Sequence, residues 1–144
     1  MKTATAAAQW IVRLTGATQV VLGILFWAGT ALGPVSLHMA IGLAFVLALL
    51  ALVSLAAAAG LRPMLVAVAA GYVLLIPVFG MEQTRLLPGP GHWVVRVAHL
   101  ALGIGGMILA ARLAGHVREH PRASGRRALA GSSAVNLSSE NQFS

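Results

Sequence analysis

Two histidines, an arginine and a glycine share one face of an apolar stretch, PGPGHWVVRVAHLALG, which runs from residue 88 to 103. They recur at spacings of four, three and four residues, as His92, Arg96, His99 and Gly103. In an α-helix, residues with these spacings lie on the same side. This face therefore holds the groups of the chain best suited to bind a ligand.

A shorter copy of the motif occurs earlier in the chain. His38 lies in LHMAIG and His99 in AHLALG, and in each copy a glycine follows four residues after the histidine. Polar groups in apolar segments are costly, so two at matched positions favour a functional role. Imidazoles ligate haem iron, and the chain has no cysteine for covalent attachment. We interpret His38 and His99 as the axial ligands of one haem, although either histidine taken alone is equally well explained by packing.

The other residues of the two motifs have roles that suit this interpretation. Gly42 and Gly103, one turn from each histidine, leave room for a porphyrin against the helix backbone, or simply allow two helices to approach closely. Arg96 can pair with haem propionates, or extend to lipid phosphates. His92 can assist a propionate or shuttle protons, or merely begin the helix.

Three further sets of polar residues are interpreted as structural. Gln19 is expected to form a hydrogen bond between helices, and Tyr72 is similarly placed. His116 and His120 have the spacing of a metal-binding pair, but they lie in a basic stretch that repels cations. We therefore expect a solvated face there.

The composition identifies a membrane protein. Of 144 residues, 58% are hydrophobic and 9% are charged, and the mean hydropathy is +0.86. Soluble domains contain about 25% charged residues. The net charge of +7 does not indicate nucleic-acid binding, because the basic residues lie at the ends of apolar runs and not on a polar face.

Four apolar runs predict four membrane-spanning helices, at about residues 9–30, 35–60, 64–80 and 92–115. The first is expected to be retained and not cleaved as a signal peptide. Gly33 and Pro34 should end it, and Pro77 should bend or end the third helix. Residues 1–120 then form one transmembrane domain, and 121–144 a disordered tail or a remnant of an affinity tag.

The distribution of basic residues predicts the orientation. Placing both termini in the cytoplasm puts two basic residues outside, Arg85 and Arg96, and eight inside: Lys2, Arg13, Arg62, Arg112, Arg118, Arg122, Arg126 and Arg127. This matches the positive-inside rule. We expect an all-α integral membrane protein, an antiparallel four-helix bundle in a bacterial-type inner membrane, with both histidine motifs in its outer half.

A four-helix membrane protein with a His-x-x-x-Gly motif on its second and fourth helices resembles the b-type cytochromes of the cytochrome b561 and respiratory-anchor kind. The resemblance covers about residues 9–115. It implies a haem b held by His38 and His99 from different helices, and electron transfer with a quinone, a quinol or a redox protein. Relatives with two haems need four histidines, two near each face, so one haem per chain is implied.

Other functions stay open at this stage. The second hypothesis is a haem-free small transporter or channel, which needs polar residues through both leaflets, and the inner half offers few of them. A further alternative is a structural or assembly subunit of a larger membrane complex, or a homo-oligomer. Whether it is an enzyme is not indicated by any residue pattern.

Overall fold

The computed structural model describes residues 2–29, 35–83 and 85–120. Over these residues the chain forms four helices: α1 (Lys2–Trp27), α2 (Val35–Ala58), α3 (Pro63–Glu82) and α4 (His92–Glu119). All four are long and apolar enough, by length and composition, to cross a membrane. The predicted all-helical class is therefore confirmed for the described part of the chain, which has four candidate membrane-spanning helices.

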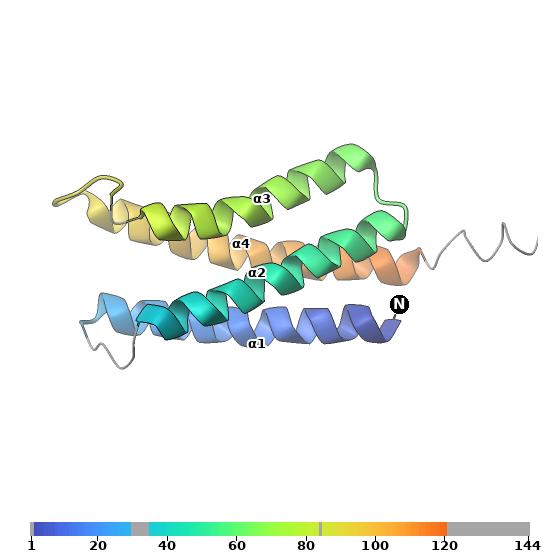
Figure 1. Ribbon diagram of the computed structural model, residues 1–144, viewed down its shortest axis with the longest axis horizontal. Coiled ribbons are helices and arrows are strands. Elements are labelled where there is room, and N and C mark those ends of the chain that lie inside the picture. Colours follow the sequence, from blue (N-terminus) through green and yellow to red (C-terminus); the bar gives the residue numbers. More distant parts are fainter. Residues whose placement is uncertain (1, 30–34, 84, 121–144) are drawn as a thin grey trace, which may run out of the picture.

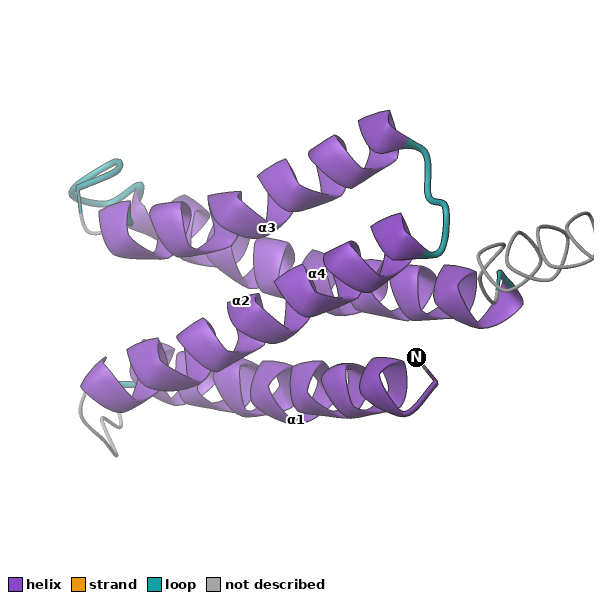
Figure 2. Ribbon diagram, turned by 45° about the vertical axis from the view of Figure 1, so that its right-hand side comes forward, coloured by secondary structure: helices purple, strands orange, loops and turns teal. Residues whose placement is uncertain are grey.

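Consecutive helices run in opposite directions (Figure 1). Helix α2 packs against all three others and α4 does the same, whereas α1 and α3 are not in contact. Helices α2 and α4 thus lie between α1 and α3 (Figures 1 and 2). We call α1 and α2 the first helix pair and α3 and α4 the second. We call the end formed by Trp27, Val35, Glu82 and His92 the histidine end, and the end formed by Lys2, Ala58, Pro63 and Glu119 the basic end.

Two helix boundaries differ from the prediction. Helix α1 begins at Lys2 and not near residue 9, because the segment before residue 9 is rich in alanine, a strong helix former, and buries Thr5 and Ala8. Helix α3 continues through Pro77 to Glu82. Of the two effects expected of Pro77, bending or ending the helix, it therefore does not end it, since a proline removes a single backbone hydrogen bond and the next turn still forms.

The connection between α2 and α3 is the tight turn that Gly60 permits. Gly60 has φ +96°, a backbone conformation that favours glycine, and the next amide, of Leu61, donates to the carbonyl of Ala56 at 3.0 Å. This is how helices commonly end when a glycine follows them. The expected role of Gly33 and Pro34, and the expected tail at 121–144, lie outside the described residues.

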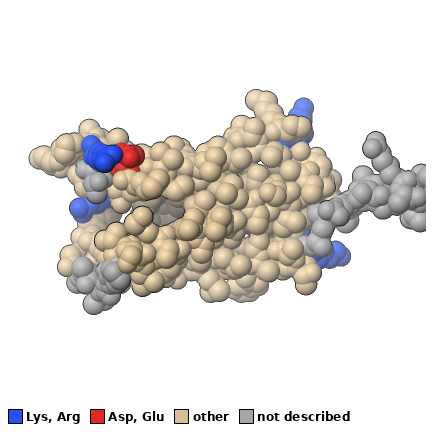
Figure 3. All heavy atoms as spheres, in the orientation of Figure 1, with Lys and Arg blue, Asp and Glu red and all other residues tan. Residues whose placement is uncertain are grey.

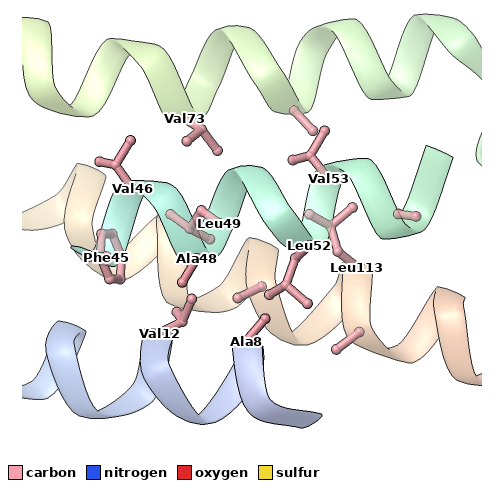
Figure 4. Packing of buried hydrophobic residues seen from close by; sticks show 14 of the residues in the cluster. Ala8, Val12, Phe45, Val46, Ala48, Leu49, Leu52, Val53, Val73 and Leu113 are labelled. Atoms are coloured by element: carbon pink, nitrogen blue, oxygen red, sulfur yellow. The ribbon is translucent and has the colours of Figure 1, made fainter. Parts of the chain in front are cut away.

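The packed core lies toward the basic end. Val12, Leu49, Leu52 and Val73 have no exposed surface, and they interdigitate between α1, α2, α3 and α4 (Figure 4). The buried residues of α1 end at Gly16, and those of α2 begin at Phe45. Residues 17–27 and 35–44, which form the histidine end of the first helix pair, therefore contribute no buried residue.

Candidate functional site

His38 and His99 lie at the same end of the bundle, on two helices that contact each other. His38 is in the first turn of α2, and His99 is the eighth residue of α4. Both side chains are half-buried. The fold thus places at one end of the bundle two histidines that are 61 positions apart in the sequence.

Neither imidazole has a hydrogen-bond partner among the described residues. Their Nδ1 atoms are both buried and unpaired, as is Oε1 of Gln19, which contacts α2 beside His38. Buried polar atoms in proteins nearly always have a partner, and one without a partner costs about 1–3 kcal/mol. Three of the four side-chain atoms of this kind in the described residues lie at the histidine end, and the fourth, Nε2 of His116, lies at the basic end.

Each imidazole is contacted by a phenylalanine from the preceding helix. The ring of Phe26 on α1 meets His38 edge-on, with centroids 5.6 Å apart and an interplanar angle of 73°. The ring of Phe79 on α3 is nearly parallel to that of His99, with centroids 6.3 Å apart and an angle of 7°. The sequence analysis missed both phenylalanines, because nothing in their spacing relates them to the histidines.

The two motif glycines have different surroundings. The place that a Cβ would take at Gly103 has no atom within 4 Å, so the room expected there is present. At Gly42 the same place is 2.6 Å from Nε2 of Gln19. The room that we expected Gly42 to leave for a porphyrin is therefore filled by Gln19, and the glycine serves the contact between α1 and α2.

The expected hydrogen bonds between helices are confirmed. Nε2 of Gln19 donates to the main-chain carbonyl of His38 at 2.9 Å. The hydroxyl of Tyr72 on α3 donates to the carbonyl of Leu102 on α4 at 2.8 Å. Each bond joins the two helices of one pair.

Arg96 and His92 lie in the first two turns of α4, at the histidine end of the bundle. Arg96 is exposed, and within the described ranges it forms no hydrogen bond or ion pair, so its guanidinium is available to an anionic group. His92 is placed differently, because its Nδ1 lies 3.4 Å from the carbonyl oxygen of Leu86 and so attaches α4 to the preceding loop.

At the same end of the bundle Arg85 pairs with Glu82 at 3.3 Å. In the space-filling view this end is hollowed between the two helix pairs, near that pair of charges (Figure 3).

Two other groups of polar side chains lie at the basic end. His116 and His120 stack with centroids 4.4 Å apart, and Nδ1 of His120 lies 3.1 Å from the carbonyl oxygen of His116. A cavity of about 260 Å³ is lined by Lys2, Thr5, Ala6 and Arg118. None of the residues that we expected to bind a cofactor lines this cavity.

The donor set at the histidine end limits what can bind there. The described part of the chain contains no group of three or more histidine, cysteine, aspartate or glutamate side chains arranged to hold a metal ion. Two imidazoles from facing helices suit instead a metal whose other positions are filled by a macrocycle, as in haem. Comparisons with protein-family models, with curated proteins and with solved structures found no match. Function is therefore inferred from these residues alone.

Proposed function

We propose that this protein is a b-type cytochrome of the membrane, with one haem b bound between His38 and His99. The observation that carries the proposal is the pair of imidazoles on two contacting helices, with both Nδ1 atoms buried and unpaired. They lie in the half of the bundle where α1 and α2 contribute no buried residue. A planar cofactor needs such a loosely packed space between helices.

The residues of the histidine end suit this group in distinct ways. His38 and His99 would each supply one imidazole nitrogen to the iron, and Gly103 leaves open space on the same face of α4 as His99. Arg96 carries an unpaired positive charge toward the boundary with water, where haem carboxylates are expected to lie. Phe26 and Phe79 restrict the directions that the two imidazoles can take.

The bound haem would supply a one-electron couple, and iron with two imidazole ligands has no open position for oxygen. We therefore propose electron exchange, with a quinol or quinone in the membrane or with a redox protein at its surface. Val12, Leu49 and Leu52 fill the other half of the bundle with apolar side chains. Exchange on one side of the membrane thus fits better than transfer across it by this chain alone.

We also propose that the histidine end faces outward from a bacterial-type inner membrane. Arg85 and Arg96 are at that end, whereas Lys2, Arg62, Arg112 and Arg118 are at the basic end. In the visible face of the molecule, basic side chains lie at both ends, acidic ones at the histidine end, and the flank between the ends carries no charge (Figure 3). The positive-inside rule then puts the basic end in the cytoplasm.

The apolar core also bears on the alternative of a transporter or channel. A conducting path needs polar groups or water through both leaflets. The side chains of Val12, Leu49 and Leu52 have no exposed surface, and they close the bundle between the histidines and the basic end. The haem-free transporter is therefore the weaker hypothesis.

The absorption spectrum of the purified protein tests the haem proposal directly. Protein purified in detergent from haem-replete cells should show a Soret band, and reduction with dithionite should give the sharp α and β bands of low-spin haem. Extraction into pyridine should give one haem b per chain. A colourless preparation from such cells would overturn the proposal and favour a structural or assembly subunit.

A further inference from the structure

Gly80 lies on α3 directly against the ring of His99. A Cβ added at Gly80 would be 3.0 Å from Cε1 of His99, 3.7 Å from Nε2 and 3.8 Å from Nδ1. Carbon atoms in contact are normally about 3.5–4.0 Å apart. The ring of His99 therefore occupies space that exists only because residue 80 has no side chain.

Phe79, the preceding residue, restrains the same ring from another direction. Its ring is inclined by only 7° to that of His99, with the centroids 6.3 Å apart. Phe79 and Gly80, two consecutive residues of α3, thus both contact the imidazole of His99 on α4. The backbone at Gly80 limits how far the ring can move toward α3, and the plane of Phe79 favours one tilt.

The corresponding place in the first helix pair holds a large side chain. His38 and His99 are 61 positions apart, and so are Gln19 and Gly80. Gln19 extends to the main-chain carbonyl of His38, whereas Gly80 leaves its place to the ring of His99. The residue at this position thus contacts the backbone of His38 in the first pair and the imidazole of His99 in the second.

We propose that Gly80 is a positioning residue of the haem site, which sets the direction of the His99 imidazole by carrying no side chain. The proposal rests on the haem function proposed above. The contact between Gly80 and the ring of His99 does not involve haem, so it can be measured in protein with and without haem.

The test compares Gly80→Ala with Gly71→Ala. Gly71 lies on the same helix, is exposed, and has no atom within 4 Å of where a Cβ would be. Alanine favours helix more than glycine does, so both variants are expected to fold. Only the alanine at position 80 meets the His99 ring.

The first measurement is made on protein prepared without haem, with histidine labelled by ¹³C at Cε1. The resonance of His99, identified by its loss in His99→Ala, should shift in Gly80→Ala and stay in place in Gly71→Ala. The second is made on haem-loaded protein, in which Gly80→Ala should lose haem or change its low-spin electron paramagnetic resonance spectrum. Gly71→Ala should match the unchanged protein.

The possible results separate the two proposals. An unshifted His99 resonance together with an unchanged low-spin spectrum in Gly80→Ala would overturn the role of Gly80 and leave the haem function standing. Wild-type protein without haem would overturn the haem function, and with it the role of Gly80 in a haem site. A His99 shift in Gly80→Ala alone would then show only that the two residues are in contact.

Discussion

The side-chain amide of Gln19 donates a hydrogen bond of 2.9 Å to the main-chain carbonyl of His38. In a regular helix that carbonyl accepts from the amide of Gly42, four residues on. Because Gly42 has no side chain, the Gln19 amide fits beside the same carbonyl. Helix α1 is thus attached to α2 at the residue that we propose as a haem ligand.

Tyr72 makes the corresponding bond in the second helix pair, but not to a histidine. Its hydroxyl donates to the carbonyl of Leu102, in the space left by the missing side chain of Gly105. Both pairs therefore use a polar side chain that reaches a carbonyl beside a glycine. Only the bond of Gln19 should affect the haem.

We expect Gln19→Leu to disturb the haem site and Tyr72→Phe to leave it intact. Each change removes one hydrogen bond between helices, worth about 1 kcal/mol in the free energy of unfolding. Gln19→Leu should also lower haem retention and shift the low-spin bands, since His38 loses the bond that fixes its backbone. Thermal unfolding and absorption spectra of both variants measure the two effects. If the spectra of both variants equal that of the unchanged protein, Gln19 has no role at the site.

The proposed ligands are tested by single substitutions. His38→Ala or His99→Ala should abolish the low-spin spectrum, because each imidazole supplies one axial bond. His116→Ala and His120→Ala should leave it unchanged, since that pair lies at the basic end. Reduced-minus-oxidised spectra at equal protein concentration make the comparison. Retention of the full low-spin spectrum after loss of His38 or His99 would show that the assignment is wrong.

The fold could be predicted from sequence because it depends on the length and apolar character of each run. Helices α2 and α4 begin at Val35 and His92, as expected. The start of α1 was missed because alanine-rich residues before residue 9 lack strong apolar character, yet they favour helix and pack against the bundle. Whether Pro77 would bend or end the third helix was left open, because surrounding contacts decide whether a helix continues past a proline.

The contacts of the site could not be predicted in the same way. Helices α2 and α3 are apolar on every side, so their sequences do not show which face meets which neighbour. The contacts of Phe79 and Gly80 with His99 depend on the rotation of α3 about its axis. Gln19 and Gly80 are separated by 61 residues, as are His38 and His99. This shared spacing could not identify Gln19 and Gly80 as corresponding positions, because the two residue types differ and only the structure shows that each lies beside a histidine.

The location of the core predicts that stability and haem binding can be separated. Leu49 has no exposed surface, whereas Leu47, two residues earlier, is 56% exposed. Leu49→Ala should lower the free energy of unfolding by about 2–5 kcal/mol through loss of packing, and Leu47→Ala by much less. Both variants should keep the low-spin spectrum when folded. Thermal unfolding in detergent, followed by circular dichroism, checks this, and an equal loss of stability in both variants would contradict the position of the core.

The last prediction concerns Arg96, the unpaired cation of the histidine end. A positive charge near a haem destabilises the oxidised iron more than the reduced iron, and so raises the reduction potential. Arg96→Leu should therefore lower the potential, by tens of millivolts, since a unit charge about 10 Å from a redox centre contributes roughly 1–2 kcal/mol at an effective dielectric constant of about 20. It should also weaken haem retention without loss of the folded protein.

Arg62→Leu is the matched control for Arg96→Leu. It removes the same charge from an exposed position at the basic end, just before α3. Its effect on the potential should be small, because the length of the bundle and the surrounding solvent screen that charge. Redox titration of both variants, followed at the α band, gives the two potentials. Equal potentials and equal haem content in the two variants would mean that Arg96 only contacts lipid phosphates, and would remove the reason for placing the haem carboxylates toward the histidine end.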